Sequence, residues 1–170
     1  MCKPDLSPVP QEWESELNRR LSLLGHRNWI VIADAAYPLQ SHPGIDTIAA
    51  AADQVHVVQT VLCQIAACKH IRASVYTDLE LGFVEEPDAP GVSEYRQQLD
   101  LLLSSLNLKQ LPHDQIVAKL DQCAQLFRIL IIKTNLTIPY TSIFLELECG
   151  YWNAESEQRL REAVRGSVST

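Results

Sequence analysis

Residues 23–38, LLGHRNWIVIADAAYP, decide the fold class of this chain. Within them, residues 29–33 are apolar throughout and β-branched at their centre, which is typical of a strand covered on both faces of a sheet. Gly25, just before this strand, is a natural end for a preceding helix. A titratable side chain stands at each end of the apolar run, His26 before it and Asp34 after it. These two residues are therefore the first candidates for a functional site.

Helical and strand-like patterns alternate over the rest of the chain. The helical segments are 11–24, 60–67, 92–106, 112–125 and 154–165, with a short helix at 45–52. The strands are 29–33, 70–79, 126–133 and 140–148, the last of them edge-like with one wetter face. This alternation predicts the α/β class, a layered sheet with parallel central strands flanked by helices. We expect one domain over residues 1–170, with an N-terminal lead-in at 1–10 and a C-terminal helical extension at 151–170.

Charge and hydropathy argue against several classes of partner. The net charge is −7 and the pI is near 5.2, whereas phosphate binding needs clustered Lys and Arg. We therefore expect no nucleic-acid partner and no anionic membrane surface. No apolar stretch approaches the roughly 20 residues of a membrane-spanning helix. The first residues, MCKPDLSPVPQEWESE, lack the apolar segment of a secretory signal, which predicts a cytoplasmic protein.

Cofactor and nucleophile motifs do not occur in the sequence. The first strand is followed by DAAYP, which is neither GxGxxG nor GxxxxGK[ST], and there is no GxSxG. Cys63 and Cys68 are five positions apart, which fits neither a CxxC redox pair nor a zinc knuckle. No group of His, Cys and acidic residues has metal-ligand spacing, so we expect neither a cofactor nor a metal ion.

Three polar residues occupy positions where chemistry is plausible. Asp34 follows the carboxyl end of a strand, where α/β sheets bind ligands, although an Asp there also commonly anchors a loop. His26 can exchange a proton near neutral pH, and its alternative is a surface histidine in a loop. His113 opens a helix beside Asp114, where helix capping and solvent exposure are the ordinary explanation.

A second polar cluster, Tyr140-Thr141-Ser142, stands at the start of the last predicted strand. Its hydroxyl groups can hydrogen-bond a polyol. Tyr, Thr and Ser are also ordinary residues of an edge strand, so the cluster alone does not decide between the two explanations.

Taken together, these motifs resemble the D-ribose pyranase / L-fucose mutarotase family. The resemblance rests on Leu24-Gly25-His26, on Ile32-Ala33-Asp34-Ala35-Ala36-Tyr37-Pro38 and on Pro139-Tyr140-Thr141-Ser142, with looser support from Leu111-Pro112-His113-Asp114-Gln115-Ile116. It covers roughly residues 15–150 in order, which is most of the chain.

The resemblance implies an isomerase that interconverts cyclic forms of a free monosaccharide, either anomers or pyranose and furanose, by acid/base proton transfer. It makes His26 the catalytic acid and base, and Asp34, His113, Tyr140 and Ser142 substrate-binding residues. No metal or cofactor takes part. The substrate is a ribose- or fucose-like sugar, and the assembly is a homo-oligomer, a ring-like decamer with sites at subunit contacts. On this interpretation the apolar strand is a rigid spacer that places His26 and Asp34 around one pocket.

One departure from the family pattern keeps an alternative open. The family usually has Asn at the position of Ser142, and Ser offers one hydroxyl in place of an amide donor and acceptor. This favours a second hypothesis, a catalytically weakened monosaccharide-binding or regulatory protein on the same scaffold. A third hypothesis is an assembly module without a ligand.

Overall fold

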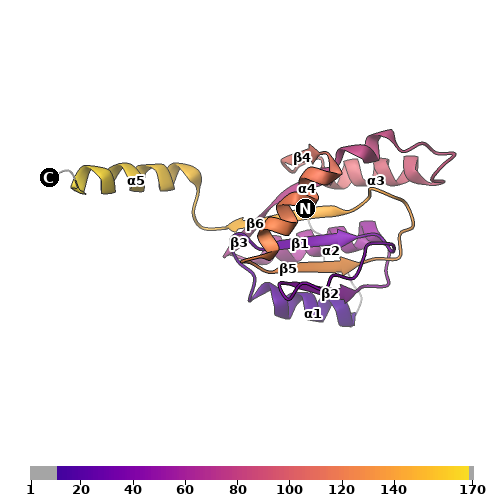
Figure 1. The fold of residues 1–170 in the computed structure, drawn as a ribbon, viewed down its shortest axis with the longest axis horizontal. Coiled ribbons are helices and arrows are strands. Elements are labelled where there is room, and N and C mark those ends of the chain that lie inside the picture. Colours follow the sequence, from indigo (N-terminus) through magenta and orange to yellow (C-terminus); the bar gives the residue numbers. More distant parts are fainter. Residues whose placement is uncertain (1–10, 169–170) are drawn as a thin grey trace.

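The computed structural model of the chain describes residues 11–168, and its strands form one six-stranded sheet in the order β2-β5-β1-β6-β3-β4 (Figure 1). The strands are β1 (Trp29–Ala33), β2 (Ile45–Ala49), β3 (Ile71–Asp78), β4 (Leu108–Leu111), β5 (Ile129–Lys133) and β6 (Ile143–Cys149). The helices are α1 (Glu12–Leu21), α2 (Gln54–Ala67), α3 (Val92–Leu103), α4 (His113–Ala124) and α5 (Ala154–Val168), with a 3-10 helix η1 (Leu79–Phe83). Among these helices, none is long and apolar enough to cross a bilayer.

The centre of the sheet combines parallel and antiparallel pairing. β1 runs parallel to β5, with Trp29 opposite Ile129, and antiparallel to β6. β2 is parallel to β5, and β4 is parallel to β3. Of the six strands in the described part of the chain, β6 alone runs in the opposite direction. The predicted α/β class with parallel central strands is confirmed.

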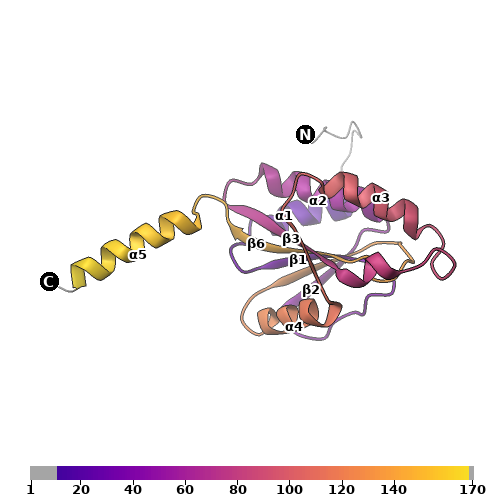
Figure 2. The ribbon, with the colours of Figure 1, turned by 90° about the horizontal axis from the view of Figure 1, so that it is seen from above.

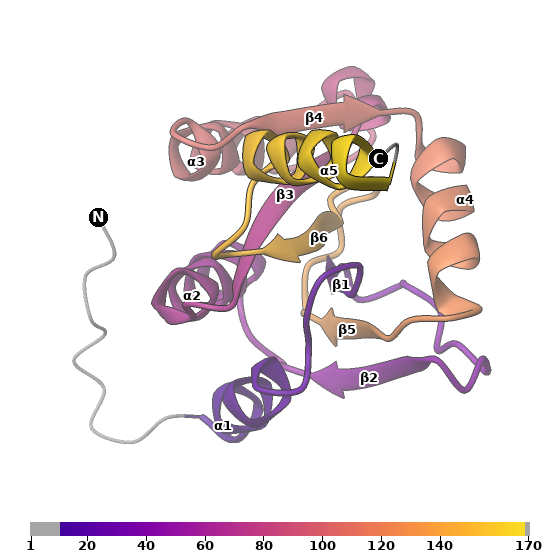
Figure 3. The ribbon, with the colours of Figure 1, turned by 90° about the vertical axis from the view of Figure 1, so that its left-hand side faces the viewer.

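Both faces of the sheet are covered by helices. α1, α2 and α3 lie on one face and α4 lies on the other (Figures 2 and 3). Side chains of β1 alternate between the two layers: Ile30 and Ile32 pack in the core under α1–α3, whereas Val31 and Ala33 pack with α4. A strand buried on both sides needs apolar residues at every position, which explains the unbroken apolar run at 29–33.

The expectation of a short helix at residues 45–52 is wrong. Residues Ile45–Ala49 form β2, an edge strand parallel to β5, with Ile45 opposite Ile129. Its side chains are half-buried or exposed, so the sequence shows neither a continuous apolar run nor a clean alternation. The conformation of β2 therefore depends on its pairing with the buried strand β5 and not on its local sequence.

The expectation that the last strand is an edge strand is also wrong, because β6 lies between β1 and β3. The more polar face of β6 carries two glutamates, and each accepts a hydrogen bond from a side chain of the neighbouring strand β3. Tyr76 donates from its hydroxyl to Glu146 at 2.8 Å, and Ser74 donates to Glu148 at 2.7 Å. A central strand tolerates charged residues where neighbouring side chains satisfy them.

Two further elements differ from expectation. The helix expected at 60–67 begins earlier, at Gln54, because Asp53 caps it by accepting a hydrogen bond from the His56 amide at 3.0 Å. β4, only four residues long, lies at the other edge of the sheet and was not predicted. The strand expected from residue 140 starts at Ile143, so Tyr140, Thr141 and Ser142 form the turn before it.

Candidate active site at the carboxyl edge of the sheet

One edge of the sheet gathers most of the predicted site residues. Asp34 follows the carboxyl end of β1, and His113 opens α4 directly after β4. Because β6 is antiparallel, its beginning lies at this same edge, together with Tyr140 and Ser142. The carboxyl edge of such a sheet is where α/β proteins bind ligands. Four of the five predicted residues therefore share one region of the molecule.

His113 is held by two carboxylates that the sequence analysis did not single out. Its Nδ1 lies 3.0 Å from Oδ1 of Asp78, the last residue of β3. Its backbone amide donates to both carboxylate oxygens of Glu80, each at 3.0 Å. With Asp78 ionised, Nδ1 carries the proton and Nε2 is left as the proton acceptor. Asp78 thus orients the imidazole, and Glu80 holds the backbone of His113 at the start of α4.

Asp78 is an unusual carboxyl group because it is 1% exposed. Burial raises its pKa from the ordinary 3.8 to about 6, although the hydrogen bond from His113 opposes the shift. Its second oxygen, Oδ2, is buried and has no hydrogen-bond partner among the described residues. A buried carboxylate oxygen without a partner is costly, and the hydrogen bond between Oδ1 and His113 offsets part of the cost of burying this group.

Asp34 borders a cavity of about 380 Å³, lined by Asp34, Ala35, Ala36, Thr137, Ile138 and Pro139. This volume lies within the range of about 300–1,000 Å³ that small-molecule pockets occupy. One carboxylate oxygen of Asp34 accepts a hydrogen bond from the Ala36 amide at 2.8 Å, so the residue does anchor its loop. No hydrogen bond from the described residues reaches the other oxygen, Oδ2, which can accept one from a ligand.

The charges at this edge also affect Tyr37 in the loop after β1. Burial, together with the negative charges of Asp78, Asp121 and Asp34, raises the pKa of Tyr37 to about 12. The Tyr37 hydroxyl therefore stays protonated at neutral pH and remains a hydrogen-bond donor beside the acidic groups.

Tyr140 has a left-handed backbone conformation, with φ at +58°, which is uncommon for a residue other than glycine. Its ring meets the imidazole of His113 edge to face, with ring centroids 5.6 Å apart. Its side chain is 42% exposed, so the ring is accessible next to the imidazole. Strained residues of this kind are held in place by surrounding structure and often occur at functional sites.

A buried polar network supplies that support. Gln54 of α2 is fully buried and donates to the Thr141 carbonyl at 2.5 Å, and the hydroxyl of Tyr95 in α3 donates to the same carbonyl at 3.0 Å. Thr134, after β5, donates to the Gln54 side chain at 2.9 Å and to the carbonyl of Ala33 at 3.0 Å. The network connects the end of β1 with the turn before β6, next to Asp34 and Tyr140.

Ser142 itself is 3% exposed. A buried hydroxyl at this position offers a ligand less contact than the exposed ring of Tyr140. Its predicted contact with a sugar remains a proposal.

His26 lies at the opposite end of the sheet from Asp34. It is exposed in the turn before β1, where the neighbouring Arg27 amide donates to the Leu147 carbonyl near the end of β6. β1 alone spans about 13 Å at the usual rise per residue, which exceeds the reach of one monosaccharide ring. The expectation that the strand places His26 and Asp34 around one pocket of the same chain is wrong, because a strand sends its two ends to opposite edges.

Asp78 and Glu80 were missed although a signal for Asp78 was present. Like Asp34, Asp78 closes a strand, but the predicted strand ran to residue 79 and hid the carboxyl end. No spacing rule connects Asp78 with His113, 35 residues later, because their contact depends on the pairing of β3 with β4.

Replacing Asp78 with asparagine is expected to stabilise the protein above pH 6. The folded state holds the Asp78 proton up to about pH 6, whereas an unfolded Asp releases it near 3.8, so stability falls as pH rises through this window. Asp78→Asn removes the buried charge and is expected to raise the free energy of unfolding at pH 8 on the order of 1–3 kcal/mol, with a smaller gain at pH 4.5.

Denaturant unfolding of wild type and Asp78→Asn at pH 4.5 and pH 8 measures this difference. The exposed Asp114→Asn, which removes one charge from the first turn of α4, is the matched control and should change little. If Asp78→Asn is no more stable than wild type at pH 8, burial of the Asp78 charge does not destabilise the protein and the prediction is contradicted.

Within residues 11–168 no group of three or more His, Cys, Asp or Glu side chains is placed to hold a metal ion. At the carboxyl edge, Asp78 instead contacts the imidazole of His113, and this imidazole contacts the ring of Tyr140. The arrangement provides hydrogen-bond acceptors for hydroxyl groups and a proton-exchanging group beside them.

Comparison with known proteins identifies the family. A sequence model of the RbsD / FucU transport protein family matches residues 11–149. The chain belongs to this family. The match ends before α5, so this helix lies outside the part shared with the family. A search of curated protein sequences finds no match.

Solved structures of the RbsD / FucU fold resemble the chain at low identity. Bacillus subtilis RbsD complexed with D-ribose is 20% identical, with a TM-score of 0.56 over 87% of this chain and 98% of that chain. The fucose mutarotase from Streptococcus pneumoniae in complex with L-fucose is 20% identical, with a TM-score of 0.55 over 84% and 98% of the two chains. FucU from Bifidobacterium longum is 14% identical, with a TM-score of 0.51 over 82% and 95%. At these identities the likeness shows the fold.

Proposed function

We propose that the protein is an isomerase that interconverts cyclic forms of a free monosaccharide, either anomers or pyranose and furanose. The observation that carries the proposal is that His113, held by Asp78, lies next to the exposed ring of Tyr140 at the same edge of the sheet as Asp34. Membership in the RbsD / FucU family and structural relatives that bind D-ribose or L-fucose support a ribose- or fucose-like substrate.

The reaction requires proton transfer alone. One group protonates the ring oxygen while another removes the proton of the anomeric hydroxyl, so the ring opens to the aldehyde. Rotation about the bond next to the carbonyl and attack by a hydroxyl group close the ring again, and both protons return. No net oxidation or reduction occurs, and neither a metal nor another cofactor is needed.

The carboxyl edge binds the sugar in this proposal. Oδ2 of Asp34 accepts hydrogen bonds from sugar hydroxyl groups, and His113, held by Asp78, contacts the sugar through Nε2. The exposed ring of Tyr140 packs against the sugar, and Ser142 contributes from the turn behind it. The buried network around Gln54 and Thr141 holds the left-handed Tyr140 in this position.

His26 takes part as the catalytic acid and base of a site completed by a second copy. Within one chain, His26 and Asp34 lie at opposite ends of β1. His26 is therefore too far from the carboxyl edge of its own chain to contact a sugar bound there. The resemblance described above places the family's sites at subunit contacts. We therefore propose a homo-oligomer, a decameric ring, in which the edge with His26 faces the carboxyl edge of a neighbour. A cytoplasmic location would give such an enzyme access to free sugars.

The alternative, a monosaccharide-binding or regulatory protein with weakened turnover, is favoured by the replacement of the usual Asn by the buried Ser142. A buried hydroxyl offers fewer hydrogen bonds to a sugar than an amide does. The binding residues would be the same, and the rate of anomer exchange would distinguish the two functions.

Saturation-transfer NMR on a panel of free sugars, including D-ribose and L-fucose, tests the proposal. We expect exchange between anomers or ring forms of at least one sugar to exceed the rate in buffer by about 10²-fold or more at micromolar protein. Sugar binding without accelerated exchange would establish the alternative. Neither binding nor exchange across the panel would refute both.

A further inference from the structure

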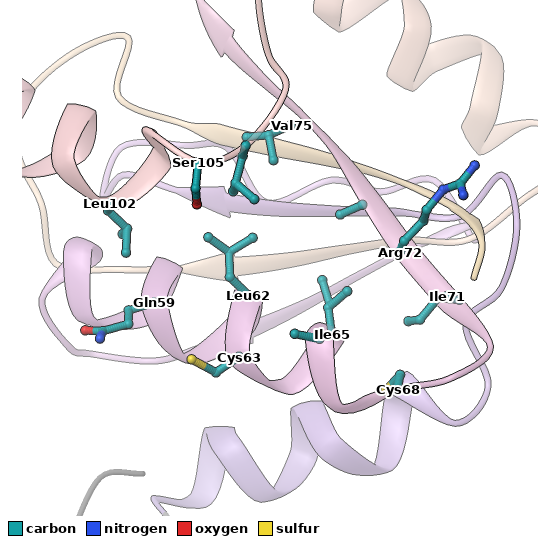
Figure 4. A pocket seen from close by; sticks show the side chains of 13 residues that line it. Gln59, Leu62, Cys63, Ile65, Cys68, Ile71, Arg72, Val75, Leu102 and Ser105 are labelled. Carbon is teal, nitrogen blue, oxygen red and sulfur yellow. The ribbon is translucent and has the colours of Figure 1, made fainter. Parts of the chain in front are cut away.

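A cavity of about 420 Å³ lies between α2, the first half of β3 and the end of α3 (Figure 4). Its walls are mainly aliphatic, formed by Leu62, Ile65, Ile71, Val75, Leu102 and Leu106. We call it the α2–α3 groove. It is distinct from the candidate active site, because Ile71 begins β3 and Asp78 ends it.

α5 has an apolar face that does not pack against the sheet or the other helices. It projects away from the sheet and the other helices (Figures 1 and 2). Leu160 and Val164 are 49% and 52% exposed, and with Ala163 they occupy one face of the helix at i, i+3 and i+4. A helix with this spacing of apolar residues is suited to lie in a hydrophobic groove.

The chain leaves the sheet toward α5 beside the end of the α2–α3 groove. Cys149, the last residue of β6, pairs with Ile71 of the groove wall, and the Gly150 amide donates to the His70 carbonyl at 2.9 Å. A side chain at Gly150 would lie 2.7 Å from the Lys69 carbonyl oxygen, so the backbone is seated tightly there. The end of β6 is therefore held next to the wall of the groove.

We propose that α5 of one copy lies in the α2–α3 groove of a second copy, and that the second copy returns the same contact. The groove lies in the helical layer of α2 and α3, next to the point where the chain leaves β6 for α5, so a two-fold axis beside this layer can satisfy both contacts at once. Exchange of an identical element between copies is a common route to dimers. The arrangement holds whether or not the protein acts on sugars.

Hydrogen exchange of the full chain, followed by mass spectrometry, tests the contact. We expect amides of α5 and of the groove to exchange at least about ten-fold more slowly at high than at low protein concentration. Leu160→Glu on α5 and Ala66→Glu, at an exposed position of the groove wall, should each abolish this protection. The matched controls Gln158→Glu and Ala67→Glu, which add the same charge outside the contact, should keep it.

A mixture of the Leu160→Glu and Ala66→Glu proteins separates exchange between copies from folding back within one chain. The intact α5 of the Ala66→Glu protein can enter the intact groove of the Leu160→Glu protein, so we expect protection to return in those two segments. Protection that does not return on mixing, or that is independent of concentration in wild type, would overturn the proposal. So would groove protection that persists in Leu160→Glu, because another segment would then occupy the groove.

Discussion

His26→Ala is expected to slow anomer exchange by about 10²–10⁴-fold, the usual contribution of a general acid or base. His26 is exposed in the turn before β1 and outside both hydrophobic cores, so its removal should leave the fold intact. Saturation-transfer NMR on the best substrate of the panel gives the rate, and thermal unfolding checks the fold.

The control for His26→Ala is His42→Ala, which removes another exposed histidine from a loop. Its exchange rate should remain within about two-fold of wild type, as is usual for surface substitutions away from special features. Equal rates for wild type and His26→Ala would show that a single carboxyl edge carries the whole reaction.

His113→Gln is expected to slow exchange by about 10–10²-fold, the effect of losing one hydrogen bond of about 1.5–3 kcal/mol to the sugar, although His113 lies at the other edge of the sheet from His26. Glutamine can still donate to Asp78 but places no ring nitrogen at the position of Nε2. Because His113 also contacts the sugar in our proposal, NMR titration should show weaker sugar binding as well as slower exchange.

Asp114→Asn serves as the control for His113→Gln, because Asp114 is exposed in the same first turn of α4. It should retain both binding and exchange. A His113→Gln protein with wild-type exchange would remove the Asp78–His113 pair from the mechanism and leave it a structural role in joining β3 to α4.

The sequence predicts the elements whose pattern is decided locally. β1 was predicted with correct bounds because its five consecutive apolar residues are β-branched at the centre and follow Gly25, a pattern typical of a strand buried on both faces. β2 and β4 were not predicted because they are short edge strands with half-exposed side chains, and their conformation depends on pairing with β5 and β3.

The candidate site follows the same division. Asp34 could be placed because the carboxyl end of a strand is visible in the sequence. The contact of Asp78 with His113 could not, because it requires β3 and β4 to pair in a known register. The role of His26 is harder still, since its partner residues in our proposal belong to another copy of the chain.

Complementation between His26→Ala and His113→Ala tests the central claim that two copies form each site. The two inactive proteins are unfolded together, refolded as a mixture and assayed by saturation-transfer NMR. With random mixing, half of the copies supply His26 and half supply His113, so about one quarter of the sites are complete and the mixture should regain about one quarter of the wild-type exchange rate. A mixture as inactive as its two components would contradict the shared site.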